Sequence, residues 1–243
     1  MHVWSLKIRD VLRHLDGLRS ILPEGDVARA ERFRLSEHRD NWIVAHGMLR
    51  TLLARYTGQE PSRIEFRYNH WGKPFLHPES GVDYLQFNLS HSHGIVLYAL
   101  ARGRKVGIDV EYVRQDLPLE DLARELFSPR QMADFLVLQP DMQPGVFHAC
   151  WTRKEAYLKA RGEGLSLSLA HFDVPLVGEG QAGAFEIEDQ HGPTGWIVQD
   201  LAPDPGYVAA VAAEGKGWRV RYRQWEKGDA ATERTALPDL SEG

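Results

Sequence analysis

A short apolar segment with two carboxylates on one side constrains this chain more than any other feature. Residues 106–113 read Val-Gly-Ile-Asp-Val-Glu-Tyr-Val, which favours a strand. Because side chains in a strand alternate with period two, Asp109 and Glu111 lie on the same face. Alternating acidic residues are also common on the solvent-facing side of an edge strand. The segment alone therefore leaves two interpretations open, a solvated edge and a pair of ligands.

A predicted helix further along the chain carries a third carboxylate. Residues 151–159 read Trp-Thr-Arg-Lys-Glu-Ala-Tyr-Leu-Lys, and the i, i+4 spacing puts Trp151, Glu155 and Lys159 on one stripe. Glu155 and Lys159 could form an exposed ion pair worth roughly 0.2–0.5 kcal/mol, but this interpretation leaves Trp151 without a role. If the helix packs on the acidic strand, three carboxylates and an ammonium converge. Such a group can hold Mg²⁺ on a phosphate ester, because Mg²⁺ binds carboxylate, water and phosphate oxygens.

Three further motifs occur in order along the chain. They are Gly-Lys-Pro at 72–74, Phe-Asn-Leu-Ser-His-Ser at 87–92 and Gly-Glu-Gly-Leu at 162–165. Together with the acidic strand and the helix, they resemble the motifs of the 4′-phosphopantetheinyl transferases. The resemblance is to the surfactin-synthetase-activating type, in which one chain contains two similar halves, and it runs from about residue 29 to residue 206.

The order of the predicted elements indicates an α+β fold, because helices are followed by runs of strands rather than alternating with them. The helices are expected over 36–56, 119–126, 128–138 and 150–161, and the strands over 64–68, 94–101, 106–110, 185–188, 196–201 and 207–213.

Three local expectations complete the prediction. Residues 3–8 alternate like an edge strand, and residues 74–80 read as an irregular stretch. Gly103 offers a turn, so the strands at 94–101 and 106–110 are expected to form a hairpin.

The resemblance implies two similar α+β halves related by pseudo-twofold symmetry, with the active site in the cleft between them. Residues 1–105 would form the N-terminal half, which binds coenzyme A. Residues 106–226 would form the C-terminal half, which carries the magnesium and catalytic residues. One chain then supplies both sides of the cleft, and we expect a monomer. Residues 227–243 are rich in Asp, Glu, Thr and Pro, and we expect a disordered tail there.

The resemblance also implies roles for the convergent side chains. Asp109, Glu111 and Glu155 would hold Mg²⁺, with Mn²⁺ as an alternative. Glu155, Lys159 and Asp109 would be the catalytic residues. In this assignment Glu155 can also act as a base toward the attacking serine, and Lys159 stabilises the pyrophosphate or its leaving group.

Contacts to coenzyme A are implied for five residues, which are Arg29, Lys73, Ser90, His91 and Lys154. Within this set, His91 would face the 3′-phosphate with Ser90 nearby. Many relatives have an arginine where this chain has Asn41, so one phosphate contact is in doubt and Arg39 is a possible substitute.

Each of these contacts has a simpler interpretation. Lys73 could lie on an ordinary exposed turn, and Lys154 could be a solvated surface lysine. Asn88 and Ser90 could bond their own backbone in a turn. The pair of histidines at 91 and 93 could suggest zinc, but no cysteine or further histidine follows at ligand spacing.

Composition narrows the class of protein. The formal charge of −5 and the pI of about 6.1 argue against a general nucleic-acid binder, which would carry a basic excess. The single cysteine, Cys150, allows no intramolecular disulfide, and we expect a small buried side chain. We find neither a secretory leader nor a membrane span in the sequence, and we expect a cytoplasmic protein.

The reaction implied by the resemblance is that of a holo-acyl-carrier-protein synthase. The phosphopantetheine arm of coenzyme A moves to a serine of an apo acyl or peptidyl carrier protein, and adenosine 3′,5′-bisphosphate is released. Two alternatives remain. One is a magnesium-dependent nucleotide phosphohydrolase, which would share the carboxylates. The other is a non-catalytic module that binds carrier proteins.

Overall fold

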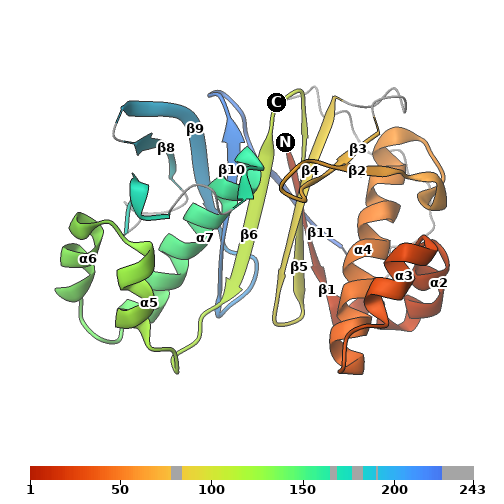
Figure 1. Ribbon diagram of the computed structural model, residues 1–243, viewed down its shortest axis with the longest axis horizontal. Coiled ribbons are helices and arrows are strands. Elements are labelled where there is room, and N and C mark those ends of the chain that lie inside the picture. The colour runs from red at the N-terminus through yellow and green to blue at the C-terminus, as the bar shows by residue number, and fades with distance from the viewer. Residues whose placement is uncertain (78–83, 165–168, 177–182, 190, 226–243) are drawn as a thin grey trace.

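Two sheets pack face to face between two outer layers of helices (Figure 1). The computed structural model describes residues 1–77, 84–164, 169–176, 183–189 and 191–225. The predicted α+β class is confirmed. In this described part of the chain, no helix is both long and apolar enough to span a bilayer.

The first sheet has the strand order β11-β1-β5-β4. Its strands are β1 (His2–Lys7), β4 (Leu85–Ser92), β5 (Ile95–Arg102) and β11 (Arg221–Gln224). Helices cover its outer face, and they are α1 (Ile8–Val11), α2 (Leu15–Ser20), α3 (Glu24–Ala30) and α4 (Ser36–Thr57), with short 3₁₀ turns at Leu12–His14 and Pro61–Arg63. A small separate ribbon pairs β2 (Phe66–Tyr68) with β3 (Pro74–Leu76).

The second sheet has the order β6-β10-β9-β8-β7. Its strands are β6 (Val106–Tyr112), β7 (Phe172–Asp173), β8 (Ala184–Asp189), β9 (Gly192–Leu201) and β10 (Tyr207–Glu214). The helices on its outer face are α5 (Leu119–Leu126), α6 (Pro129–Leu136) and α7 (Gln143–Arg161), and a 3₁₀ turn follows at Leu169–His171.

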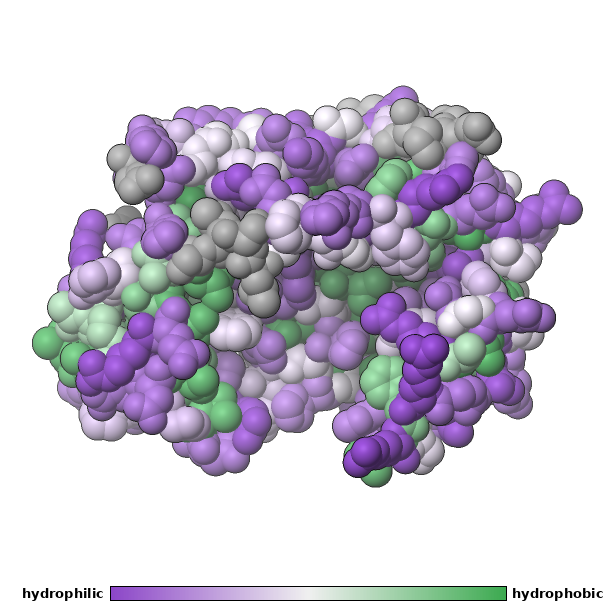
Figure 2. All heavy atoms as spheres, in the orientation of Figure 1, coloured by the Kyte–Doolittle hydropathy of each residue, from purple (hydrophilic) through white to green (hydrophobic). Residues whose placement is uncertain are grey.

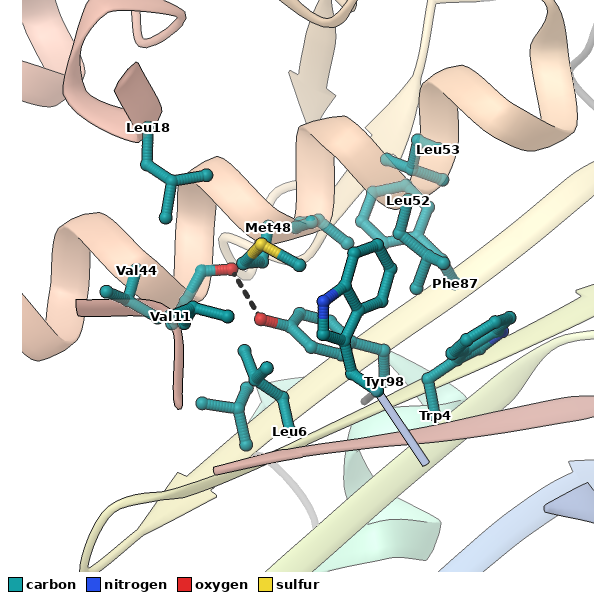
Figure 3. Packing of buried hydrophobic residues seen from close by; sticks show 14 of the residues in the cluster. Trp4, Leu6, Val11, Leu18, Val44, Met48, Leu52, Leu53, Phe87 and Tyr98 are labelled. Atoms are coloured by element: carbon teal, nitrogen blue, oxygen red, sulfur yellow. Dashed lines mark hydrogen bonds between the residues drawn. The ribbon is translucent and has the colours of Figure 1, made fainter. Parts of the chain in front are cut away.

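Helix α4 seals the outer face of the first sheet. Figure 3 shows Met48 and Leu52 of α4 directed toward the sheet, where Tyr98 of β5 lies beneath them. The hydroxyl of Tyr98 donates to the Ala45 carbonyl at 3.0 Å, which satisfies the one polar atom of this buried ring. A β-carbon at Gly47 would lie 2.8 Å from Leu18, so glycine here permits the close packing of α2.

Strand β5 is buried on both faces, which explains its uninterrupted apolar sequence. Its even-numbered side chains, such as Val96 and Leu100, enter the core beneath α4. Its odd-numbered side chains, such as Leu97 and Ala99, meet Ile108 and other residues of β6 and β10 in a third core between the sheets. The two sheets are therefore joined by an apolar layer.

Two local predictions are wrong. The strands at 94–101 and 106–110 do not form a hairpin, because β5 pairs with β1 and β4 while β6 crosses to the second sheet and pairs with β10. The reason is the second apolar face of β5, which needs the other sheet to cover it. The strand at 3–8 is not an edge strand, because the distant β11 pairs with it in parallel.

The remaining differences concern element bounds and elements that were not predicted, which are α1, α2, α3, β4, β7 and β11. The predicted helix at 150–161 begins earlier, at Gln143, with Pro144 in its first turn. Part of the stretch predicted to be irregular, 74–80, forms β3, and its last residues lie outside the described part, as does the tail at 227–243. The division at residue 105 stays a prediction, although β11, which lies after residue 105, pairs with β1, which lies before it.

Candidate active site

Helix α7 rests directly on β6 at a glycine. A β-carbon built at Gly107 would lie 2.1 Å from the Ala156 carbonyl oxygen and 2.2 Å from the Ala160 nitrogen. No other residue type fits such an approach of helix backbone to strand backbone. This contact brings the face of α7 that carries Glu155 and Lys159 alongside the acidic face of β6.

Polar side chains of β4 join the edges of the two sheets. The Asn88 side-chain oxygen accepts from the Ile108 backbone nitrogen at 2.9 Å, and the Ser92 hydroxyl accepts from the Tyr112 nitrogen at 3.2 Å. Both pairs are 20 residues apart in sequence, so β4 and β6 run parallel. Because these residues alternate along β4, they share the face that meets β6.

Ser90, between them on the same face, belongs to a three-residue cluster. The Asp109 Oδ1 atom accepts from Lys159 Nζ at 2.6 Å and from Ser90 Oγ at 2.8 Å, and Lys159 Nζ also lies 3.0 Å from Ser90 Oγ. Asp109 is 3% exposed. Its Oδ2 atom is buried and makes no hydrogen bond to any described residue. A buried carboxylate oxygen without a partner is costly, and it indicates that a ligand completes the site.

Three carboxylates share this region, and the ionised forms of two of them, Glu111 and Glu155, are disfavoured. Burial raises the pKa of Glu111, and the charge of Asp109 raises it further. Burial and Asp109 likewise raise the pKa of Glu155, while Lys159 opposes the shift. The Ser92 hydroxyl donates to Glu111 Oε2 at 2.9 Å. One ammonium faces three acidic groups, so an additional cation would stabilise the cluster.

The donor set fits a hard divalent cation such as Mg²⁺ or Mn²⁺. All of its members are carboxylates, and such cations prefer oxygen ligands. The unpartnered Oδ2 of Asp109 offers a lone pair in the buried part of the site. Among the described residues, no group of three or more histidine, cysteine, aspartate or glutamate side chains is placed so that it could hold a metal ion. The fit therefore rests on donor chemistry and charge.

A cavity of about 260 Å³ lies beside Lys159 and Glu155. It is lined by Trp71, Gly72, Lys73, Pro74 and Asn88 from the first part of the chain and by Glu155, Leu158, Lys159, Gly162 and Gly164 from the second. Trp71 is half exposed and packs over Gly164. The space-filling view also shows an indentation between the two helical sides of the molecule along the lower edge (Figure 2).

Lys73 lies in the wall of this cavity, but its ammonium turns toward the protein. It donates to the Val106 and Ala160 carbonyls, each at 3.0 Å. Burial, with the charge of Lys105, lowers the pKa of Lys73 to about 8. The same loop is fixed by Asn69, whose side-chain nitrogen donates to the Gly162 carbonyl at 2.6 Å. The Gly-Lys-Pro loop thus docks on the end of α7 rather than forming a free surface turn.

The Gly-Glu-Gly-Leu motif ends α7. Gly162 is the left-handed C-cap, with φ of 70°, and its amide bonds the Leu158 carbonyl. A β-carbon there would lie 2.9 Å from the Lys73 side chain, so the loop fits against this end because the residue is glycine. Leu165 lies outside the described residues.

Arg29 and His91 lie near a further histidine that sequence reasoning missed. The Arg29 guanidinium is 5.9 Å from the centre of the Trp42 ring. The His46 ring stacks on the same Trp42 ring, with 3.8 Å between the ring centres. Burial lowers the pKa of His46 to about 4, and the charge of His91 contributes to the shift. The pKa of His91 is lowered by burial and then by Lys159. Basic groups from α3, α4 and β4 therefore approach one region.

Ser90 and His91 lie within β4, a strand that was not predicted from the sequence. The alternative in which Asn88 and Ser90 bond their own backbone in a turn is wrong, since both side chains bond β6 residues. Arg39 pairs with Asp40 on α4 at 2.9 Å. Its proposed substitution for the arginine missing at Asn41 stays a prediction.

Lys154 is not part of the site. It is 1% exposed, and its ammonium donates to the carbonyls of Leu126 at 3.0 Å, Leu169 at 2.6 Å and Phe172 at 2.9 Å. All three protons are used, on the side of α7 that faces α5 and β7. Neither the coenzyme contact nor the solvated surface position predicted for Lys154 agrees with this burial.

The expectation for Cys150 is confirmed, since it is buried and burial raises the pKa of its thiol to about 12.

The site contains three polar residues that the prediction did not assign, which are His46, Asn88 and Ser92. The period-two spacing of Asn88, Ser90 and Ser92 was present in the sequence as a signal for a polar strand face. It became interpretable only when β4 proved to be a sheet edge beside β6. No sequence signal distinguished His46 from an ordinary helix residue.

Comparisons with known proteins point to one family. Residues 105–212 match the family model of the 4′-phosphopantetheinyl transferase superfamily, and residues 10–102 match that of the 4′-phosphopantetheinyl transferase N-terminal region. The chain is 36% identical over 222 residues to the 4′-phosphopantetheinyl transferase HetI of Nostoc sp., covering 91% of each protein. It is 32% identical over 185 residues to the 4′-phosphopantetheinyl transferase Sfp of Bacillus subtilis, covering 76% of this chain and 79% of Sfp.

Proposed function

This chain belongs to the 4′-phosphopantetheinyl transferase superfamily, and we propose that it moves the 4′-phosphopantetheine arm of coenzyme A to a serine hydroxyl of an apo acyl or peptidyl carrier protein. The observation that carries the proposal is the cluster of Asp109, Lys159 and Ser90, which joins β6, α7 and β4 around a carboxylate oxygen with no described hydrogen-bond partner.

The proposed reaction is a phosphoryl-type transfer. The serine oxygen attacks the phosphorus that carries the pantetheine arm and forms a new P–O bond, while the bond from that phosphorus to the bridging oxygen breaks. The leaving group is adenosine 3′,5′-bisphosphate, and the serine proton passes to Glu155. Burial and the charge of Asp109 shift the pKa of Glu155 upward, which makes its carboxylate a stronger base.

Lys159 stabilises the negative charge that develops on the leaving group. Lys159 lines the cavity, and its ammonium is bound to Asp109 and Ser90. A fixed cation in a partly buried site stabilises such charge more strongly than it would in water. Asp109, Glu111 and Glu155 would hold Mg²⁺ or Mn²⁺. When bound, the cation neutralises charge on the pyrophosphate oxygens.

Coenzyme A is proposed to contact four of the five predicted residues. Arg29 and His91 bind the 3′-phosphate from α3 and β4, and Ser90 lies beside them. Lys73 contributes the wall of the cavity in which the arm is held. His46 lies close enough to His91 for their charges to interact, which adds it to this basic region.

The two family matches on either side of residue 105 support an active site formed between two halves of one chain. We therefore propose that the protein works as a monomer in the cytoplasm, and that residues 1–105 and 106–226 supply opposite sides of the cleft.

The test is intact-mass analysis of a panel of apo carrier proteins incubated with this protein, coenzyme A and Mg²⁺. Matched samples contain a chelator, or a carrier in which the acceptor serine is replaced by alanine. A gain of one phosphopantetheinyl group that needs both the metal and the serine is expected. Asp109→Asn, which keeps the shape of the side chain, should lose the activity while the fold remains. Unchanged masses on every carrier would refute the proposal.

A further inference from the structure

A strained histidine lies in the turn between β4 and β5. His93 has a φ of 42°, and Gly94, the next residue, has a φ of 84°. In the described part of the chain His93 is the only residue other than glycine with a positive φ. Two central residues of positive φ suit a tight hairpin, but asparagine or glycine is the usual first residue. A strained residue beside a site indicates that its side chain has a function there.

The side chain and backbone of His93 both contact the second sheet. Its ring lies 4.9 Å from the ring of Tyr112 on β6, with the planes tilted by 34°. Its carbonyl accepts from the hydroxyl of Tyr207 on β10 at 2.6 Å. The ring of Tyr112 in turn packs on Gly206, where a β-carbon would lie only 3.2 Å away. The turn of the first sheet is thus held by two aromatic residues of the second.

The hydrogen bonds of Ser92 link this turn to the acidic site. A serine hydroxyl has one proton and two lone pairs. The proton is donated to Glu111 Oε2 at 2.9 Å, and one lone pair accepts from the Tyr112 nitrogen at 3.2 Å. His93 Nδ1 lies 3.2 Å from the same oxygen. With the serine proton committed to Glu111, the His93 nitrogen must be the donor to the second lone pair.

We propose that His93 is a positioning residue for Glu111, acting through Ser92. By filling the last lone pair of the hydroxyl, His93 fixes the rotation of the Ser92 O–H bond so that it points at Glu111. Glu111 then holds the orientation in which it completes the carboxylate set. This inference rests on the proposed function, because it assigns Glu111 to cation binding.

The geometry offers a matched pair of variants. In His93→Gly the strain is relieved and the donor is lost, so the turn still forms. In His93→Asn the side-chain amide nitrogen is three bonds from Cα, as Nδ1 is in histidine, and asparagine tolerates positive φ. The asparagine variant therefore keeps both the turn and the donor, and the glycine variant keeps the turn alone.

The experiment measures binding of Mn²⁺ in the presence of coenzyme A and without a carrier protein, from the loss of the free Mn²⁺ EPR signal. Because partners that orient metal ligands are typically worth about 10- to 100-fold in metal affinity, His93→Gly should weaken Mn²⁺ binding about 10-fold and His93→Asn less than about twofold. Ser92→Ala removes the donor to Glu111 itself and should weaken binding at least as much as His93→Gly.

Wild-type Mn²⁺ affinity in His93→Gly would overturn the proposal. Equal weakening in the glycine and asparagine variants would also overturn it, since the ring contact with Tyr112 and not the hydrogen bond would then matter. Thermal unfolding without metal confirms that both variants fold. Failure of the proposed function would instead be seen in the wild type, as an absence of both Mn²⁺ binding and phosphopantetheine transfer, so the two failures are distinguishable.

Discussion

Gly107→Ala should separate the two elements that form the site. The added methyl would lie 2.1 Å from the Ala156 carbonyl oxygen and 2.2 Å from the Ala160 nitrogen, both of which belong to helix backbone. Ordinary contact begins near 3.4 Å, and a close-packed interior offers no free space, so α7 must move away from β6 by about 1 Å. Overpacking of this kind typically costs about 1–3 kcal/mol.

The same movement displaces Lys159 and Glu155 from Asp109. Lys159 Nζ on α7 donates to Asp109 Oδ1 on β6 at 2.6 Å, and this hydrogen bond depends on the present distance between the helix and the strand. Because a misplacement of about 1 Å can cost about 100-fold in rate, kcat on a carrier protein should fall by about that factor. The melting temperature should fall by roughly 2–12 °C, given about 2–4 °C per kcal/mol for a chain of this size.

Gly145→Ala is the matched control. It lies in the first turns of the same helix, and a β-carbon there meets no described atom within 4 Å. Alanine favours a helix over glycine by about 1 kcal/mol, so this variant should be as stable as the wild type or more stable, with full activity. Thermal unfolding and initial rates on one carrier check both variants. Wild-type stability and rate in Gly107→Ala would refute the account of the packing between strand and helix.

Three further predictions follow from single residues. His91→Ala should raise the KM for coenzyme A and leave that for 3′-dephospho-coenzyme A unchanged, because only the former carries the 3′-phosphate; equal changes in steady-state kinetics would exclude this role. Lys154→Met should lower the free energy of unfolding by about 2–4 kcal/mol in urea titrations, since three buried carbonyls lose their donor; a change near zero would contradict the structural role. Burial lowers the pKa of His46 to about 4, so the folded state takes up a proton less readily than the unfolded state. The contribution of neutral His46 to the free energy of unfolding should be fully present above pH 6.5 and should be lost as the pH drops toward 4, by up to about 3 kcal/mol. His46→Phe should lose this pH dependence.

The functional faces of the acidic strand and of the helix were predictable because each depends on local periodicity. Period two fixed the shared face of Asp109 and Glu111, and the helical spacing fixed that of Glu155 and Lys159. The bonds of Asp109 to Ser90 and of Glu111 to Ser92 agree with the first assignment, and the common cavity that Glu155 and Lys159 line agrees with the second.

The errors came from pairings between segments distant in sequence. The turn signal at Gly103 predicted a hairpin, but the second apolar face of β5 needed cover from β6 and β10. The parallel pairing of β11 with β1 joins residues more than 200 positions apart, which local patterns cannot reveal. Local spacing also could not predict the three carbonyls that bury the ammonium of Lys154.

The central claim is that Asp109, Glu111 and Glu155 bind one divalent cation beside the pyrophosphate of coenzyme A. The most direct test is a crystal structure with coenzyme A and Mn²⁺, in which anomalous scattering locates the metal. The account predicts a single Mn²⁺ that contacts oxygens of all three carboxylates and of the pyrophosphate, with Asp109 Oδ2 among its ligands. A metal bound elsewhere, or coenzyme A bound away from these carboxylates, would contradict it.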